Sequence, residues 1–271
     1  TQELAANLGH PDWVVVDCRF DMAIPDDGYA QYCKAHILGA VYAHLDRDLS
    51  SPVTPTSGRH PLPEAAVLFA TLSRLGIGVD TQVVVYDSSG GSYADRLWWL
   101  LRLYGHTAAA VLNGGFPRWL AENRPLAGGK EQNPARVFQG HFHPEMLAEE
   151  DDVQRAAADP TARLVDARAP ERYRGEVEPI DAVAGHIPGA INRPYGLNLD
   201  QNGQMRSPEE LRLEFERLLN GADPRDAIFY CGSGVTATHH LLAMEAAGMP
   251  GARLYAGSWS KWIRDPQRSI A

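Results

Sequence analysis

Cys231 stands between a predicted strand and a predicted helix, where a thiol is well placed to react. The apolar run 227–230 precedes it, and the helix-forming stretch 238–247 follows the turn 232–237. Gly232 and Gly234 lie in that turn and let the backbone fold tightly. Backbone N–H groups and the positive end of the helix dipole then face the thiol and favour its nucleophilic thiolate form. The same N–H groups can stabilise the negative charge of a second sulfur bound to Cys231.

The elements around this cysteine occur twice in the chain. Four segments recur in the same order, about 145–150 residues apart: an apolar strand ending in Asp-x-Arg, a His-Ile-x-Gly-Ala element, a second apolar strand, and a turn followed by tryptophan. They span 14–19, 36–40, 83–90 and 112–119 in the first copy, and 163–168, 186–190, 226–234 and 255–262 in the second. We therefore predict two copies of one domain. The first copy has Asp87 where the second has Cys231, so thiol chemistry belongs to the second copy only.

Strands alternate with helices in each copy, which predicts an α/β fold with a parallel sheet flanked by helices. The best-defined helix spans Pro208–Leu219, with Ser207 as its N-cap and Glu210 completing a capping box. The predicted domains are residues 1–126, as a catalytically inactive copy, and residues 145–271, as the catalytic copy. Residues 127–144 contain glycine and proline, and we expect a linker there together with the strand that leads into the second domain.

Composition narrows the class of protein and its partners. The 271 residues suffice for two globular domains, with 44% hydrophobic and 22% charged residues. No apolar run approaches the ~20 residues of a membrane span, so no membrane partner is expected. The net charge of −9, without a basic stripe, argues against nucleic acid. Three cysteines favour a reducing compartment, hence the cytoplasm, with the periplasm left open; Cys18, directly after a predicted strand, is expected to be structural.

The loop 231–237, Cys-Gly-Ser-Gly-Val-Thr-Ala, resembles the active-site loop of the tandem-domain rhodaneses, and in particular that of their 3-mercaptopyruvate sulfurtransferase branch. The repeated His-Ile-x-Gly-Ala element and the stretch 257–262, Gly-Ser-Trp-Ser-Lys-Trp, resemble further features of that family. The resemblance covers essentially the whole chain, including an inactive first copy. It implies an α/β fold of two tandem rhodanese-like domains.

The resemblance also implies a sulfurtransferase reaction in two steps. The Cys231 thiolate attacks a sulfur donor, 3-mercaptopyruvate or thiosulfate, and keeps one sulfur as a persulfide. Cyanide, a small thiol or a thioredoxin-like protein then removes the outer sulfur. No cofactor or metal is implied. The histidine pairs at 141/143 and 239/240 have no cysteine or carboxylate at metal-ligand spacing, so we expect ordinary histidines there.

Further site residues follow from the resemblance. The family pattern implies that Cys231 works with Ser233, and with His60 and Asp46 from the first domain, as a relay that moves a proton. Arg172, in the sequence Arg-Tyr-Arg-Gly, corresponds to an arginine that binds the anionic end of the donor, which suits a guanidinium fork. The loop is expected to contribute to substrate binding through Gly232, Gly234, Val235 and Thr236.

Two departures from the family pattern concern the donor. The mercaptopyruvate branch usually carries a second arginine in a Pro-Glu-Pro-Arg stretch, where this chain has Val-Glu-Pro-Ile at 177–180. The thiosulfate branch has basic residues directly after the cysteine, where this chain has Gly232 and Ser233. The loop favours 3-mercaptopyruvate, and thiosulfate stays the alternative donor.

Two other functions use a similar loop. Cysteine phosphatases and arsenate reductases carry Cys-x5-Arg, but the sixth residue after Cys231 is Ala237, which cannot pair with a phosphoryl group. A persulfide carrier that serves a protein acceptor would use the same cysteine. Rapid thiocyanate formation from a small donor would favour the enzyme, and release of sulfur only to a protein would favour the carrier.

Overall fold

The computed structural model describes residues 1–159 and 161–271, which divide into two compact units. Unit 1 comprises Thr1–Ser51, Leu62–His143 and Gln201–Gln204. Unit 2 comprises Pro52–Pro61, Pro144–Asp200 and Met205–Ala271. The segment Pro52–Pro61 therefore belongs to unit 2, although it lies in the first half of the sequence. The predicted domain boundaries, 1–126 and 145–271, do not include this assignment of Pro52–Pro61 to unit 2. In other respects these boundaries stay a prediction.

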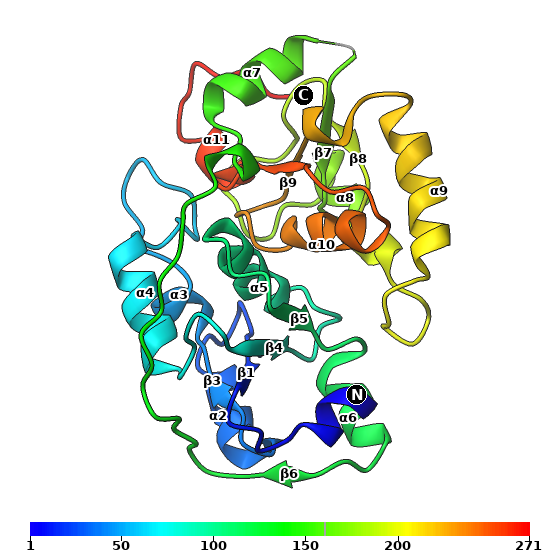
Figure 1. Ribbon diagram of the computed structural model, residues 1–271. Helices are drawn as coiled ribbons and strands as arrows, with labels where there is room; N and C mark the ends of the chain where they lie inside the picture. The colour runs from blue at the N-terminus through cyan, green and yellow to red at the C-terminus, as the bar shows by residue number, and fades with distance from the viewer. Residues whose placement is uncertain (160) are drawn as a thin grey trace. The chain divides into compact units, whose positions relative to one another are not determined.

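Unit 1 is built on a parallel sheet with the strand order β3-β1-β4-β5. These strands are β1 (Trp13–Asp17), β3 (Val41–Tyr42), β4 (Gln82–Tyr86) and β5 (Ala109–Val111), and an antiparallel pair joins β2 (His36–Ile37) to β6 (Leu126–Ala127). The helices are α1 (Gln2–Ala6), α2 (Asp27–Lys34), α3 (Leu45–Asp48), α4 (Ala65–Arg74), α5 (Ala94–Leu103) and α6 (Gly115–Ala121). Val15 and Val84 pack with Trp119 of α6 on one face, and α5 covers the other (Figure 1).

Unit 2 repeats this sheet, with the strand order β10-β9-β7-β8 and every pair parallel. Its strands are β7 (Arg163–Asp166), β8 (Ile191–Asn192), β9 (Ala227–Tyr230) and β10 (Arg253–Leu254). Its α-helices are α7 (Glu150–Ala158), α8 (Pro170–Tyr173), α9 (Pro208–Leu219), α10 (Thr238–Ala246) and α11 (Ser258–Trp262), and its 3₁₀ helices are η1 (Pro144–Met146), η2 (Tyr195–Asn198) and η3 (Pro224–Asp226). In Figure 1, α7 and α11 lie on one side of the sheet, and α9 and α10 on the other. Read from the opposite edge, the order matches unit 1, because β7, β8, β9 and β10 take the places of β1, β3, β4 and β5. The predicted α/β repeat is confirmed.

The helix that the sequence predicts most sharply forms as expected. Helix α9 spans Pro208–Leu219, with Pro208 in its first turn. The Ser207 side chain accepts from the backbone of Glu210, whose side chain accepts from the backbone of Ser207. This capping box satisfies N–H groups that a helix start otherwise leaves unpaired. Leu211, Phe215 and Leu219 are buried, so the predicted apolar face packs into the core.

The strand expected in residues 127–144 differs from the prediction. Within that segment only Ala127 is part of a strand, the two-residue β6, and β6 pairs with β2 of unit 1. Residues 128–143 contain no strand. A short antiparallel pairing in unit 1 thus takes the place of a strand leading into the second domain.

A buried Asp–Arg–Tyr arrangement explains why Asp-x-Arg recurs in the sequence. In unit 2, the Asp166 carboxylate accepts from the backbone N–H of Arg168 at 2.9 Å and from its guanidinium at 2.7 Å. The Tyr230 hydroxyl accepts from the backbone N–H of Ile187 at 3.2 Å. The same contacts recur in unit 1, at 2.9, 2.6 and 3.2 Å, among Asp17, Arg19, Tyr86 and Ile37. These paired charges lie at the carboxyl ends of the strands and order the loops that follow.

The histidines of the His-Ile-x-Gly-Ala elements have a structural role. His186 stacks on Tyr173 with ring centroids 3.8 Å apart, and its Nδ1 lies 2.8 Å from the Tyr173 carbonyl oxygen. His36 stacks on Tyr32 at 4.2 Å and makes the same carbonyl contact at 2.8 Å.

No helix within residues 1–159 or 161–271 has both the length and the apolar character that a membrane crossing requires.

Candidate active site

Cys231 follows directly after β9 and lies beneath its own loop. Its side chain is buried, with 2% of the residue exposed. The backbone N–H of Gly234 donates to Cys231 Sγ at 3.2 Å. The loop then enters α10 at Thr238, as the sequence predicts. The thiol thus receives a backbone hydrogen bond at the carboxyl end of a parallel strand, which is where open sheets bind their ligands.

Residues of α11 hold the cysteine loop in place through hydrogen bonds. The backbone N–H of Cys231 donates to Ser258 Oγ at 3.1 Å, and the backbone N–H of Trp259 donates to the Cys231 carbonyl at 3.0 Å. The backbone N–H of Ser260 donates to the Gly232 carbonyl at 2.9 Å. Ser258 adopts a φ of +53°, which is uncommon for a residue with a side chain. These contacts fix the backbone on both sides of the thiol.

Gly234 is required by its backbone conformation and by its surroundings. Its φ is +74°, a region that other residues rarely adopt. A Cβ at this position would also overlap the carbonyl oxygen of Ala256, which is backbone and cannot move aside. The amide that reaches Cys231 Sγ therefore depends on glycine.

Gly234→Ala is expected to lower thermal stability and to reduce sulfur transfer at least about tenfold, because positive φ costs about 1–2 kcal/mol and the overlap shifts the amide. Thermal unfolding and steady-state rates check this. The matched control is Gly196→Ala in the same unit, where an added Cβ meets no atom within 4 Å. Equal melting temperatures and rates for the two variants would show that the amide geometry at Gly234 is unimportant.

In unit 1, the loop that corresponds to the cysteine loop surrounds an anion, the carboxylate of Asp87. Asp87 takes the place of Cys231, and its Oδ1 accepts from the backbone N–H groups of Ser89 at 2.8 Å and Gly91 at 2.9 Å. Its Oδ2 accepts from the backbone N–H groups of Tyr93 at 2.8 Å and Ala94 at 3.0 Å. Four amides thus surround one carboxylate. A turn of this repeated design holds a negative charge at the position that follows the strand.

His60 and Ser233, predicted to act together, are hydrogen-bonded within unit 2. His60 Nδ1 lies 2.7 Å from Ser233 Oγ, and both residues are buried. The segment that carries His60 is anchored by the backbone N–H of Arg59, which donates to Ser260 Oγ at 3.0 Å. Asp46 lies exposed in the first turn of α3 in unit 1, so its part in the relay stays a prediction.

Arg172, which is predicted to bind the donor, lies beside the loop, and a second arginine lies with it. A Cβ added to Gly232 would stand 2.7 Å from Nη2 of Arg59, and 3.6 and 3.7 Å from the terminal nitrogens of Arg172. Gly232 is not among the residues with positive φ. Its missing side chain therefore makes room for two guanidinium groups rather than for an unusual turn.

Two buried carboxylates hold these arginines. Arg59 Nη1 forms an ion pair with Asp181, and Arg172 Nη2 lies 3.2 Å from Asp181 and 2.7 Å from Glu178. Both acid side chains are 4% exposed. Burial alone would raise the pKa of Glu178, but hydrogen bonds from Arg172 and from backbone N–H groups outweigh it and lower the pKa. Glu178 therefore stays ionised at neutral pH, and the ion pairs with Glu178 and Asp181 fix the two guanidinium groups.

The remaining predicted loop residues occupy different surroundings. Val235 is buried and its carbonyl accepts from the Thr238 hydroxyl at 2.6 Å, whereas Thr236 is half-buried. No sequence pattern singles out Arg59, because it lies far from Cys231 along the chain. The family pattern alone points to its neighbour His60. The only sequence signal for Arg59 is that it is a basic residue directly before that histidine.

A buried polar network lies behind the loop, where α10 packs. His240 Nε2 donates to the Arg193 carbonyl at 2.7 Å, and its Nδ1 accepts from the Arg193 guanidinium at 3.1 Å. His239 Nδ1 lies 2.9 Å from the amide nitrogen of Asn198. Burial and then the positive charge of Arg193 hold the pKa of His240 well below its usual range. Both histidines are thus fully engaged in the core, and no cluster that could hold a metal is found among the described residues.

The lowered pKa of His240 predicts that the folded protein loses stability in acid. It is neutral in the folded state, whereas the unfolded chain protonates near pH 6.5, so stability is lost as the pH falls below that value. The free energy of unfolding should fall by about 1.4 kcal/mol per pH unit from this residue alone. Urea unfolding at several pH values checks the slope, which should flatten in His240→Gln and stay unchanged in His141→Gln at an exposed site. Equal slopes in both variants would exclude His240 as the cause.

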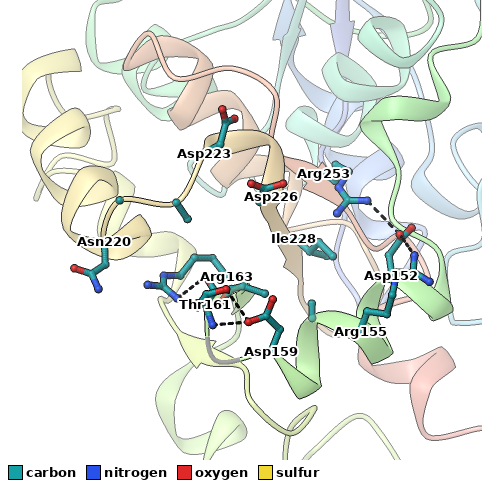
Figure 2. Close-up of a pocket in the computed structure, with 14 residues that line it drawn as sticks. Asp152, Arg155, Asp159, Thr161, Arg163, Asn220, Asp223, Asp226, Ile228 and Arg253 are labelled. Carbon is teal, nitrogen blue, oxygen red and sulfur yellow. Dashed lines mark hydrogen bonds and ion pairs between the residues drawn. The ribbon is translucent and has the colours of Figure 1, made fainter.

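A large polar cavity lies at the opposite end of the sheet in unit 2 (Figure 2). Its volume is about 850 Å³, and charged side chains such as Arg155, Arg253 and Asp226 line it. Asp152 pairs with Arg155 at 2.6 Å and with Arg253 at 3.4 Å. Because Asp226 precedes β9 whereas Cys231 follows it, this cavity is separate from the thiol site.

The other two cysteines differ from Cys231. Burial, followed by the charges of Asp17 and Asp87, raises the pKa of Cys18 well above its usual range, which disfavours the nucleophilic thiolate form and is consistent with a structural role. Cys33 is half-buried in α2. Neither lies in a glycine-containing loop after a strand of the sheet.

Comparisons with known proteins identify the family of this chain. The model of the rhodanese-like domain matches residues 1–122 and 149–265. A Pseudomonas aeruginosa protein named "Probable 3-mercaptopyruvate sulfurtransferase" is 46% identical over 272 residues, covering 100% of this chain and 96% of that protein. Thiosulfate sulfurtransferase of Rattus norvegicus is 37% identical over 242 residues, covering 86% of this chain and 79% of that protein.

The solved structure of 3-mercaptopyruvate sulfurtransferase from Leishmania major matches with a TM-score of 0.85 at 33% identity, covering 98% of this chain and 74% of that one. Family model, full-length relative and solved structure thus agree with the repeated fold. The family resemblance of the loop 231–237 is confirmed. This chain belongs to the rhodanese family, as a sulfurtransferase with two rhodanese-like domains.

Proposed function

We propose that this sulfurtransferase takes a sulfur atom from 3-mercaptopyruvate, holds it as a persulfide on Cys231, and passes it to cyanide or a thiol. The observation that carries the proposal is the hydrogen bond from the Gly234 amide to Cys231 Sγ in a loop whose counterpart in unit 1 surrounds a carboxylate. A loop that accommodates one anion suits both a thiolate and the terminal sulfur of a persulfide.

The first half-reaction balances without an outside oxidant. The Cys231 thiolate attacks the donor sulfur, an S–S bond forms, and the donor's C–S bond breaks. The electron pair of that bond stays on carbon as the enolate of pyruvate. One proton then moves from the transferred S–H to the enolate carbon, which leaves pyruvate and a persulfide anion.

The hydrogen-bonded pair of His60 and Ser233 supports a proton relay for this step. A 2.7 Å hydrogen bond between two buried groups is suited to proton transfer within a site shielded from water. We include Asp46 in the relay as the group that would orient His60, on the family pattern alone. Arg172 is proposed to bind the donor's carboxylate, since its guanidinium faces Gly232 next to the thiol.

The second half-reaction regenerates the thiolate. Cyanide or a thiolate attacks the outer sulfur, and the S–S bond breaks with its electron pair returning to Cys231 Sγ.

Free thiols Cys18, Cys33 and Cys231 are consistent with the reducing environment of the cytoplasm, and we propose that location. A thioredoxin-like protein is a further acceptor class that fits this chemistry.

Thiosulfate is the second candidate donor, and similarity to the rat thiosulfate sulfurtransferase favours it. The residues that follow Cys231 favour mercaptopyruvate instead. Gly232 and Ser233 are not the basic residues that follow the cysteine in the thiosulfate branch, and a proton relay speeds the reaction only when the leaving group is a carbon enolate.

A side-by-side comparison of the two donors, with cyanide as acceptor and thiocyanate as the measured product, tests the proposal. We expect kcat/KM to be at least about tenfold higher with 3-mercaptopyruvate, a difference of about 1.4 kcal/mol in transition-state stabilisation. A higher value with thiosulfate would reverse the donor assignment. Transfer to a protein thiol without thiocyanate formation from either donor would instead indicate a persulfide carrier.

A further inference from the structure

We propose that Ser260 is a positioning residue for the proton relay of His60 and Ser233. Its side chain holds the segment Pro52–Pro61, which carries His60, against the cysteine loop 231–237. This inference rests on the proposed function, because the relay is part of that function. Ser260 lies in α11 of unit 2, and only 2% of the residue is exposed.

Ser260 contacts the backbone next to each member of the relay. Its Oγ accepts at 3.0 Å from the backbone N–H of Arg59, the residue directly before His60. Its own backbone N–H donates at 2.9 Å to the carbonyl of Gly232, the residue directly before Ser233. One residue thus holds both sides of the pair, whose side chains meet at 2.7 Å.

The equivalent residue of unit 1 can make neither contact. Trp259 of α11 and Phe116 of α6 take equivalent places, because the backbone N–H of each donates to the carbonyl of the residue that follows β9 or β4. The next residue is Ser260 in unit 2 and Pro117 in unit 1. Proline has neither a backbone N–H nor a hydroxyl. The two contacts are therefore a feature of the copy that carries the thiol.

Gly58 brings the segment close enough for these contacts. A Cβ at this position would stand 2.7 Å from the carbonyl oxygen of Gly257 and 3.0 Å from Ser260 Oγ. Gly58 is not among the residues with positive φ, so its backbone conformation does not require glycine. Its missing side chain instead lets the segment Pro52–Pro61 pack directly on the start of α11.

The hydroxyl of Ser260 can be removed without loss of its backbone contact. In Ser260→Ala the Arg59 N–H loses its acceptor, whereas the backbone N–H of residue 260 still reaches the Gly232 carbonyl. The change therefore loosens His60 and leaves the cysteine loop in place. Misplacing a group that takes part in the reaction by about 1 Å can cost up to about 10²-fold in rate.

Steady-state kinetics of Ser260→Ala with both donors test the inference. We expect kcat to fall about tenfold with 3-mercaptopyruvate and less than about threefold with thiosulfate, whose leaving group needs no proton. The ratio of the two kcat values does not depend on how much of the variant is folded. Ser269→Ala, at an exposed serine of unit 2, is the matched control and should keep wild-type kcat with both donors.

Hydrogen exchange shows whether the segment itself is released. The Arg59 amide should exchange at least about tenfold faster in Ser260→Ala than in the wild type, because its hydrogen bond to Oγ is lost. Gly58→Ala displaces the segment from the other side of the same contact. This second variant should show the same donor-selective loss of kcat, although Ser260 is unchanged in it.

The double variant of Ser260→Ala and His60→Gln shows whether Ser260 acts through His60. Residues that act through one group are not additive, so the double variant should be no slower than His60→Gln alone. Equal losses with both donors, multiplied losses in the double variant, or an unchanged Arg59 exchange rate would each overturn the role of Ser260.

Failure of this inference is distinguishable from failure of the proposed function. If His60→Gln slows 3-mercaptopyruvate turnover and Ser260→Ala keeps wild-type kcat, only the positioning role of Ser260 is overturned. If His60→Gln itself keeps wild-type kcat with 3-mercaptopyruvate, the proposed relay is wrong and the inference falls with it.

Discussion

Replacing Cys231 with serine is expected to abolish sulfur transfer from both 3-mercaptopyruvate and thiosulfate, by at least about 10³-fold. A hydroxyl cannot form the S–S bond on which both half-reactions depend. The fold should survive, because a serine oxygen can accept the Gly234 N–H in place of Sγ. Thiocyanate formation with each donor, together with a thermal melt, provides the measurement.

Cys33→Ser is the matched control for this experiment. Cys33 is a free thiol in α2 of unit 1, half-buried and outside the candidate site. Its variant should keep wild-type rates with both donors. Retention of more than a few per cent of the activity by Cys231→Ser would remove this thiol from the mechanism, whatever the geometry around it.

Loss of the His60–Ser233 hydrogen bond should affect the two donors differently. With 3-mercaptopyruvate the leaving group is a carbon enolate that must gain a proton, and a positioned relay contributes about 10²-fold or more to such a step. With thiosulfate the leaving group is sulfite, which departs as an anion and needs no proton. Ser233→Ala and His60→Gln should therefore lower kcat about 10²-fold with mercaptopyruvate and less than about threefold with thiosulfate.

Measuring kcat for each variant with both donors checks this selectivity, and the double variant extends it. Groups that act as one relay are not additive, so the double variant should be no slower than the slower single variant. Equal losses with the two donors would indicate that the 2.7 Å contact positions the loop rather than moving a proton.

The repeated fold follows from local sequence features. Apolar strands ending in Asp-x-Arg recur because each Asp166 or Asp17 carboxylate must pair with its own arginine at a buried strand end. The capping residues of α9 are read directly from Ser207 and Glu210, since both contacts lie within one turn. The loop of Cys231 is equally local, because strand, glycines and helix are consecutive.

Long-range features could not be predicted in the same way. Arg59 lies over Gly232 only because the segment Pro52–Pro61 belongs to unit 2, and no periodicity encodes such an exchange. The sequence also suggests that Gly232 serves a tight turn, whereas its missing Cβ makes room for arginines. The prediction of a strand leading into the second domain within 127–144 was wrong. Gly128 and Gly129 follow directly on the two-residue strand β6, and β6 pairs with β2 within unit 1.

Mass spectrometry of the protein after reaction with 3-mercaptopyruvate, without any acceptor, tests the central claim most directly. The intact chain should gain the mass of one sulfur atom, peptide mapping should place that sulfur on Cys231, and cyanide should remove it. An unchanged mass under turnover conditions, or a sulfur found on Cys18 or Cys33 instead, would contradict the account.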